Sequence, residues 1–361
     1  MKEREEYNFL RIYPSASDWA LMETAYDATV FHCRKWNDYI RQMGESVLVL
    51  EVLEGGRVIG HFVGAFRRVL FLKLVMAPSM GTGTYAQGLC MQIPVTKETR
   101  LDIYRQLVQW LFRSRQADYV QICDWQLRTE FVGEPEEWSD PDLEALGIYY
   151  NRRYTYCLDI RKPIDELWSN LHYKSCKYSI NKARKQGLSV KIVEKEEEIE
   201  PFVDQHLLHI QDLLDRKKNL GLPCQSRKNI SALCHALFPD RILMMEVLGQ
   251  NEAGERVSMA SGIFANGSAG STFFTGASYH DYMSYCPNEL MVWEAIQALH
   301  EREAGSFIFG GTASYKKKFA PAYACVPVMI FSRFSLLLGV RRLLKIGYEK
   351  ALSILWHLKR K

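Results

Sequence analysis

The sequence predicts an α/β (α+β) protein made of two tandem copies of one unit, each a mixed β-sheet flanked by helices. The first observation is a repeated strand-turn-strand segment. Residues 46–66 and 241–265 each contain Glu-Val-Leu, a glycine-containing turn and an Arg-Val pair. The second is an amphipathic helix, from Leu101 and from Leu290, that is followed in both halves by a strand. Although α/β segments often look alike, four elements recur in one order at an offset of roughly 190 residues, which indicates a duplication.

Length and composition fit this organisation. A chain of 361 residues is long enough for two domains, and 47% hydrophobic with 24% charged residues is ordinary for a globular protein. We expect an N-terminal domain at residues 1–160, a C-terminal domain at 161–325, and a basic amphipathic helical segment at 326–361. A net charge of +4 is too small to make the whole molecule a nucleic-acid binder.

The N-terminus lacks the apolar run and the small-residue cleavage site of a signal peptide. Nine scattered cysteines fit reduced thiols better than a disulfide framework. We therefore expect a cytoplasmic protein. The segment from residue 340 has an apolar face and many basic residues, so two placements stay open for it: peripheral contact with the inner face of an anionic membrane, or docking on the C-terminal domain.

The elements of the second copy can be followed along the chain. Strand-like runs at residues 257–264 and 271–277 flank the turn Asn266-Gly267-Ser268. Pro287 begins a helix with apolar residues at spacings of three and four: Leu290, Met291, Trp293, Ile296 and Leu299. A short strand at residues 306–309 and a basic loop follow. We expect these elements to form the core of the second unit.

Short motifs in this half resemble those of a known family. Gly276-Ala277-Ser278 follows the hairpin, Pro287 precedes the helix, and Gly310-Gly311 ends the last strand. Residues 315–319 then read Tyr-Lys-Lys-Lys-Phe, and residues 168–187 hold Trp-x-x-Leu, a basic Ile-x-x-Ala stretch and a glycine. Together these motifs resemble the FemAB/CelD-like branch of the GNAT acyltransferase superfamily.

Three residues differ from the family pattern: Lys177 replaces a frequent Arg, Ile308 a frequent Asp, and Ala320 a usual Gly. Neither copy has the Gln/Arg-x-x-Gly-x-Gly/Ala pyrophosphate loop of acetyl-CoA-dependent members. The long helical hairpin of some tRNA-dependent Fem enzymes is not predicted either. The acyl donor therefore stays open at this point.

The resemblance implies an amide-forming N-acyltransferase with no bound cofactor, using acyl-CoA or aminoacyl-tRNA as co-substrate. It implies a small-molecule or lipid-linked amine acceptor among the peptidoglycan or polysaccharide precursors of the cell envelope. The first copy would then be degenerate and supply an acceptor groove. Two alternatives remain: a non-catalytic protein that binds an anionic envelope precursor, and an N-acylamino-acid synthase that uses long-chain acyl donors.

Two basic segments are candidate anion-binding sites. On a helical wheel, Lys174, Lys177 and Arg184 fall on one side of the helix predicted at residues 164–186, beside an apolar stripe that includes Cys176 and Ile180. Such a stripe suits a diphosphate, CoA or a tRNA backbone, although a basic helix face is often only solvated. The family match adds Lys182 to this group and adds four residues of the second segment: Gly310, Gly311, Lys316 and Lys318.

Acyl transfer needs a neutral amine and stabilisation of a tetrahedral oxyanion. The candidate catalytic residues are His280, Asp281, Glu289 and Tyr315, and each of them can instead be a helix cap or a loop residue. Other chemistries are weaker. His206 and His209 lack further ligands at zinc-binding spacing, and Cys33, Cys176 and Cys234 match buried structural thiols better than nucleophiles.

Overall fold

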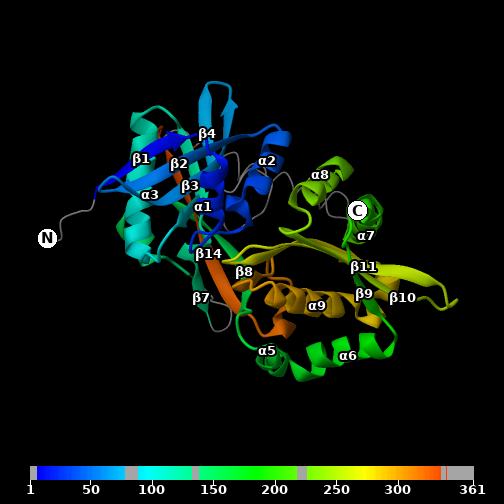
Figure 1. Cartoon of the computed structure of the whole chain (residues 1–361). Coiled ribbons are helices and arrows are strands. Elements are labelled where there is room, and N and C mark those ends of the chain that lie inside the picture. Colours follow the sequence, from blue (N-terminus) through cyan, green and yellow to red (C-terminus); the bar gives the residue numbers. More distant parts are fainter. Residues whose placement is uncertain (1–5, 78–87, 132–137, 218–225, 335–338, 340–361) are drawn as a thin grey trace.

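The computed structural model describes residues 6–77, 88–131, 138–217, 226–334 and 339 (Figure 1). The first unit begins with an antiparallel set of strands and two short helices: β1 (Tyr7–Ile12), α1 (Ala16–Glu23), η1 (Val30–His32), α2 (Arg34–Gln42), β2 (Ser46–Glu54), β3 (Arg57–Val69), β4 (Leu72–Ala77) and β5 (Gly88–Met91). It continues through a long helix to the strand that links the halves: α3 (Lys97–Arg113), β6 (Tyr119–Cys123), η2 (Trp125–Leu127), β7 (Thr129–Phe131), α4 (Pro141–Ala145) and β8 (Tyr150–Asp159).

The second unit starts with helices and returns to strands. Its first part comprises α5 (Ile164–Asn170), η3 (Tyr173–Lys177), α6 (Tyr178–Lys185), β9 (Ser189–Ile192), η4 (Glu196–Glu198), α7 (Ile199–Lys217) and α8 (Arg227–Leu237). Its second part comprises β10 (Ile242–Gln250), β11 (Arg256–Ala265), β12 (Ser271–Ser278), η5 (His280–Tyr285), α9 (Pro287–Glu301), β13 (Ser306–Ile308), η6 (Ser314–Phe319) and β14 (Ala322–Ser332). No helix of the described residues is long and apolar enough to cross a bilayer.

The two halves repeat one arrangement. In the first, β1 to β4 are antiparallel neighbours, and β6 pairs parallel with β4 after α3. In the second, β9 to β12 are antiparallel, and β13 pairs parallel with β12 after α9. A register shift follows Val52 in β2 and Val247 in β10, the middle residue of each Glu-Val-Leu. The predicted duplication and its mixed sheets are confirmed.

The halves join in one continuous sheet, because two strands pair across the boundary. The strand order within the described residues is β1-β2-β3-β4-β6-β14-β8-β13-β12-β11-β10-β9. The last strand, β14, lies between β6 and β8, and β8 also pairs with β13. The C-terminal strand of the described residues therefore completes the sheet next to the first unit.

This strand corrects one expectation. We predicted a helical segment from residue 326, but residues 326–332 belong to β14. The run Val326 to Ile330 is buried on both faces of the sheet, since Val326 and Val328 pack in one apolar cluster and Met329 in another. A continuous apolar run of this kind is typical of a central strand. The rest of the segment lies outside the described residues, apart from residue 339.

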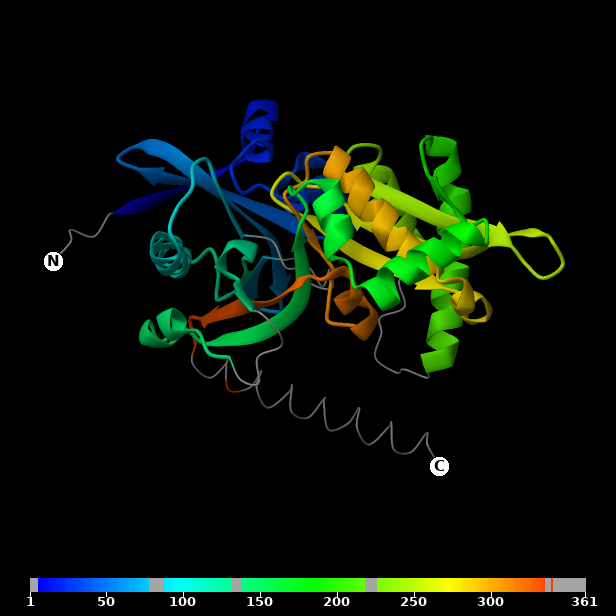
Figure 2. The ribbon, with the colours of Figure 1, turned by 90° about the horizontal axis from the view of Figure 1, so that it is seen from below.

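Helices cover both faces of the second unit's sheet. The face under α6 and α9 holds a cluster that includes Ile180, Leu290 and Trp293. The opposite face, under α2, α7 and α8, holds Trp36, Phe202 and Ile230. Figure 1 shows α9 and α6 below the strands and α7 and α8 above them. Seen from below, α9 and α6 lie in front of these strands (Figure 2). The predicted apolar face of α9 is confirmed, because all five of its predicted residues are buried.

Candidate active site

The parallel strands β12 and β13 separate soon after they pair. Their register comprises only Ser271 with Phe307 and Thr272 with Ile308. Beyond it, Gly310 has φ +65°, and a Cβ at this position would lie 2.6 Å from the carbonyl oxygen of Phe273. Glycine is required there, because other residues rarely adopt that φ and have no room for a side chain. Ligands of open α/β sheets bind just beyond such strand ends.

A lysine from the next loop lies at this strand end. Lys316, in η6, is only 7% exposed, and its Nζ donates to the carbonyl oxygens of Phe309 and Gly310. The ring of Phe273 lies 5.3 Å from the same Nζ. Among the described residues no carboxylate pairs with Lys316. Burial lowers the pKa of Lys316 to about 8, since the charged form loses hydration.

Two further predicted residues are next to Lys316. Glu289, in the first turn of α9, accepts a hydrogen bond from Lys318 Nζ at 2.7 Å. The Tyr315 ring lies 5.8 Å from Lys316 Nζ, and burial together with the nearby Glu289 carboxylate raises the pKa of Tyr315. The Tyr315 phenol is therefore protonated at neutral pH. We call Glu289, Tyr315, Lys316 and Lys318 the Lys316 cluster.

The predicted helix at residues 164–186 is interrupted. α5 ends at Asn170, and after an extended stretch the chain continues in the π-helical turn η3 and in α6. The backbone N–H of His172 donates to the carbonyl oxygen of Lys318 at 3.1 Å, which fixes η3 beside η6. The N–H of His172 therefore bonds to a distant residue and not to a carbonyl oxygen of its own helix. Gly187, with φ +77°, ends α6 as predicted.

The basic residues of this segment have different surroundings. Lys177 Nζ donates to the carbonyl oxygen of Ser169 at 2.8 Å, and Arg184 forms an ion pair with Glu294 of α9 at 2.8 Å. Lys174 is exposed and Lys182 half-buried, and neither makes a side-chain ion pair with a described residue. Thus η3 brings Lys174 and Lys177 beside the Lys316 cluster, whereas Arg184 ties α6 to α9.

His280 and Asp281 lie elsewhere. Both are exposed in η5. The backbone N–H of His280 donates to the carboxylate of Asp212 in α7 at 3.2 Å. The guanidinium of Arg216 donates to Nδ1 of the His280 ring at 3.3 Å. No hydrogen bond or ion pair among the described residues joins them to the Lys316 cluster, so of the predicted bases only Glu289 meets the basic loop.

A cavity of about 310 Å³ lies at the junction of the two units. Trp125 and Arg128 of the first unit line one side, and Asn170 and Ala320 of the second line another. Arg128 stacks on the Trp125 ring at 4.5 Å and pairs with Glu130 at 2.7 Å. Because Ala320 follows the η6 loop directly, this polar cavity borders the loop that holds Lys316.

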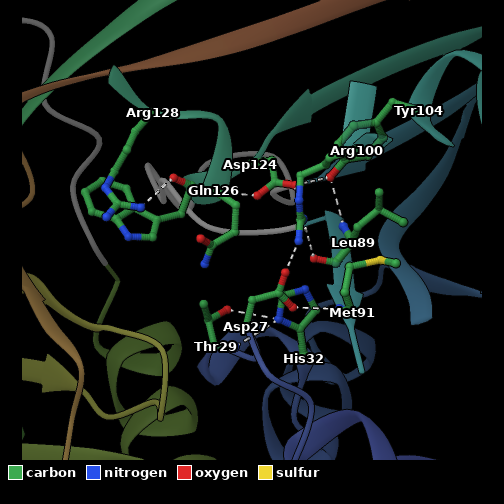
Figure 3. Close-up of polar contacts among 11 residues, drawn as sticks. Asp27, Thr29, His32, Leu89, Met91, Arg100, Tyr104, Asp124, Gln126 and Arg128 are labelled. Atoms are coloured by element: carbon green, nitrogen blue, oxygen red, sulfur yellow. Dashed lines mark hydrogen bonds and ion pairs between the residues drawn. The ribbon is translucent and has the colours of Figure 1, made fainter. Parts of the chain in front are cut away.

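The sequence analysis missed a buried polar network in the first unit. Figure 3 shows Arg100 of α3 between the carboxylates of Asp27 and Asp124, with which it forms ion pairs. The Tyr104 hydroxyl also donates to Asp124, at 2.5 Å, and all four side chains are buried. One signal was available: Arg100 lies on the apolar stripe that includes Tyr104 and Leu107 of α3.

The network lies at the end of β6, the strand that corresponds to β13 of the second unit. In the first unit Asp124 follows β6 directly, as Phe309 follows β13 in the second. Here a paired guanidinium contacts the strand end. In the second unit the corresponding position has two glycines with positive φ and an amine that pairs with no carboxylate among the described residues. The two copies therefore differ where the parallel strands end.

The three predicted cysteines are core residues. Cys33, Cys176 and Cys234 are all buried. Burial raises the pKa of Cys33 to about 11 and the pKa of Cys176 and Cys234 to about 12. Their thiols are protonated at neutral pH, whereas a nucleophilic cysteine needs the thiolate.

His206 and His209 share one serine. Their Nδ1 atoms lie 2.8 and 2.7 Å from the hydroxyl oxygen of Ser261. Since a hydroxyl has one proton, it donates to one ring and accepts from the other, so the two imidazoles hold opposite tautomers. Burial lowers the pKa of His206 to about 3 and that of His209 to about 4. Both are neutral core residues, and no metal-binding group of three or more ligands occurs among the described residues.

Comparison with known proteins agrees with this geometry. Residues 172–317 match the family described as an acetyltransferase (GNAT) domain. None of the curated proteins matches the sequence. Among solved structures, the chain is similar to the crystal structure of FemX, with a TM-score of 0.64 and 13% identity over 88% of this chain and 96% of that one.

Two further solved structures share the fold. One is a conserved protein of unknown function from Bacteroides thetaiotaomicron, with a TM-score of 0.53 and 10% identity over 88% of this chain and 99% of that one. The other is L-PGS from Bacillus licheniformis, with a TM-score of 0.50 and 10% identity over 90% of this chain and 93% of that one. At such identities the likeness shows the fold alone.

The family match and the fold define the class of protein. The matched region contains η3, α9 and most of η6, and so nearly all of the Lys316 cluster. Residues 172–317 thus match a GNAT acyltransferase domain that lies in the second unit. The chain shares its two-unit fold with FemX.

Proposed function

We propose that the chain transfers an acyl or aminoacyl group to the amine of a cell-envelope precursor, and that Lys316 stabilises the oxyanion of this reaction. The observation that supports the proposal is a buried lysine without a carboxylate partner at the parted ends of β12 and β13. A buried cation is costly unless a negative charge compensates it. During the reaction, the negative charge that develops on the carbonyl oxygen would compensate the charge of Lys316.

The chemistry follows from this placement. The neutral amine of the acceptor attacks the carbonyl carbon and forms the C–N bond, while the C–S bond of acyl-CoA or the C–O bond of aminoacyl-tRNA breaks. The Lys316 ammonium stabilises the tetrahedral oxyanion, and the protonated phenol of Tyr315 donates to the leaving group. The amine loses its proton to Glu289, which Lys318 orients.

The donor and the acceptor would enter from different sides. Lys174, Lys177 and Lys182 of η3 and α6 are assigned to the phosphates of the donor, because η3 adjoins the Lys316 cluster. The cavity at the junction of the units is assigned to the acceptor. Its paired arginines, Arg128 and Arg161, suit an acceptor with several hydrogen-bonding groups.

The first unit would then bind the acceptor without catalysing a reaction. At its strand end the guanidinium of Arg100 is fully used by Asp27 and Asp124, so it offers no cation to an oxyanion. This assignment fits the expected degenerate copy at residues 1–160. The second unit, at residues 161–325, would contain the catalytic groups.

A donor screen tests the proposal. Purified protein is incubated with an amine acceptor and with acetyl-CoA, long-chain acyl-CoA, acyl carrier protein or charged tRNA, and mass spectrometry detects the amide. We expect one donor class to give turnover that Lys316→Ala abolishes and that Lys317→Ala, at the exposed neighbouring lysine, leaves intact. Absence of any amide with all four donors and a panel of envelope amines would reject the proposal.

The pH dependence of turnover gives a second prediction. Lys316 must be protonated to stabilise an oxyanion, and its pKa is lowered to about 8. The basic limb of the rate profile is therefore expected to fall as pH rises through about 8. In Lys316→Arg the side chain keeps its charge at every accessible pH, so this decrease should disappear even if the rate is lower. Measurement of kcat from pH 6 to pH 10 for both proteins would show whether the decrease is lost in Lys316→Arg. An identical basic limb in both proteins would contradict the role given to Lys316.

A further inference from the structure

The β3–β4 hairpin ends in an exposed apolar turn. Its two turn residues, Leu70 and Phe71, are 85% and 78% exposed, and Val69 beside them is 43% exposed. Figure 1 shows this hairpin projecting from the first unit at the top of the view. Leucine and phenylalanine side chains are normally buried in a folded protein. Here two large apolar side chains are exposed at the tip of a projecting hairpin.

The backbone of the turn is strained as well. Leu70 has φ +55°, in the left-handed region. Two-residue hairpin turns favour Asn or Gly at such positions, because a larger side chain clashes with the backbone. The apolar residues therefore oppose both solvation and local backbone preference. Neither cost has a compensating contact within the described residues.

The second unit provides an internal comparison. Its β11–β12 turn occupies the same place in the repeat and reads Asn266-Gly267-Ser268. The backbone N–H of Ala269 donates to the carbonyl oxygen of Ala28 at 3.0 Å, and the Ser268 hydroxyl donates to the same oxygen at 3.1 Å. Ordinary turn residues thus serve this position of the fold, and that turn is covered by the first unit. An apolar turn is not a requirement of the architecture.

Basic residues surround the apolar turn. Arg68 is exposed on β3, and Lys73 of β4 donates to the carbonyl oxygen of Arg115 at 2.7 Å, so the end of α3 adjoins the hairpin. The backbone N–H of Arg333, after β14, donates to the carbonyl oxygen of Asp118 at 2.9 Å, and its side chain pairs with the Asp118 carboxylate at 3.5 Å. Arg67 of β3 is also exposed and pairs with Glu45. Basic side chains outnumber acidic ones here.

An apolar tip within a basic ring matches one kind of partner. The apolar residues suit the boundary between headgroups and acyl chains, and the basic residues suit anionic headgroups around it. The chain also leaves the described sheet at this edge, through Phe334, towards residues 335–361. That remaining sequence is itself strongly basic.

We propose that the β3–β4 hairpin is a membrane anchor, in which Leu70 and Phe71 insert into an anionic lipid surface and the surrounding arginines and lysines bind its headgroups. This inference does not depend on the identity of the acyl donor or acceptor. It assigns a lipid surface to the first unit, away from the Lys316 cluster.

Flotation with lipid vesicles tests the anchor. The full chain is mixed with vesicles of phosphatidylcholine alone or of phosphatidylcholine with phosphatidylglycerol. We expect binding to the anionic vesicles only. The variant Leu70→Asn with Phe71→Gly, which takes the Asn-Gly pair from the longer turn of the second unit at residues 266–270, should bind them about tenfold or more weakly, because two apolar side chains no longer insert. The variant should melt no lower than the parent protein, since Asn-Gly suits the turn.

A matched control separates insertion from general apolar exposure. Tyr13→Ser removes a ring that is 88% exposed outside the hairpin, and its binding to anionic vesicles should change by less than roughly twofold. Arg68→Glu with Arg115→Glu should weaken binding and reduce its salt dependence. The proposal is overturned if the parent chain does not bind anionic vesicles or if the Asn-Gly variant binds equally well. It is also overturned if sedimentation shows that the tip mediates self-association while vesicle binding is unaffected.

Discussion

Replacing Lys316 by alanine is expected to lower kcat for acyl transfer by about two to three orders of magnitude, the usual cost of losing one oxyanion-stabilising group. The free energy of unfolding should change little, because alanine removes the burial of a cation together with its two bonds to carbonyl oxygens. The affinity for the donor should be nearly unchanged, since the assigned phosphate contacts lie on η3 and α6. Steady-state kinetics and donor titration measure the two effects separately.

Two variants sharpen this test. Lys317→Ala, at the exposed neighbour, should keep nearly full kcat. Lys316→Arg retains the charge in a larger group and should recover part of the lost rate. A Lys316→Ala protein with unchanged kcat would exclude oxyanion stabilisation by this residue. A loss confined to donor affinity would instead place Lys316 among the phosphate-binding groups.

Replacing Arg100 by methionine is expected to destabilise the protein by about 3 to 5 kcal/mol, because two buried carboxylates would lose the cation between them. Asp27 and Asp124 are both buried, so water cannot replace the guanidinium without local opening. Urea unfolding followed by tryptophan fluorescence measures the change. The first unit is expected to unfold before the second.

The same helix contains the control. Arg105 pairs with Asp102 at the i,i+3 spacing and is partly exposed, so Arg105→Met should cost less than about 1 kcal/mol. Adding Asp27→Asn and Asp124→Asn to Arg100→Met should recover part of the loss, since the uncompensated charges disappear. Equal destabilisation by Arg100→Met and Arg105→Met would show that the network contributes nothing beyond an ordinary surface pair.

Local patterns in the sequence were enough to predict the repeated elements. The hairpin about Asn266-Gly267 and the amphipathic helix from Pro287 were predicted from residues within a few positions of each other. Such patterns are reliable because turn geometry and the helical period are set by neighbouring residues. The GNAT-like motifs at residues 276–278 and 310–311 depend on equally local backbone requirements.

Burial and pairing between distant residues were beyond such patterns. The family resemblance pointed to Lys316 and Lys318, but no local pattern showed that Lys316 is buried while Lys317 is exposed. The burial arises because the η6 loop folds back on the carbonyl oxygens after β13. Asp27, Arg100 and Asp124 are far apart in the chain, so nothing local to any of them indicates their ion pairs.

The sequence by itself determined that this chain has two α/β copies, a basic loop after the second Gly-Gly, and the motifs of an acyltransferase family. Only the tertiary structure decided which lysine lies at the parted strands and which predicted bases meet it. It also decided that β14 pairs with β6 and β8, although 326–332 had been expected to be helical. The physical reason is that a residue's chemistry depends on its hydration and charged neighbours, and these come from segments that meet only when the chain folds.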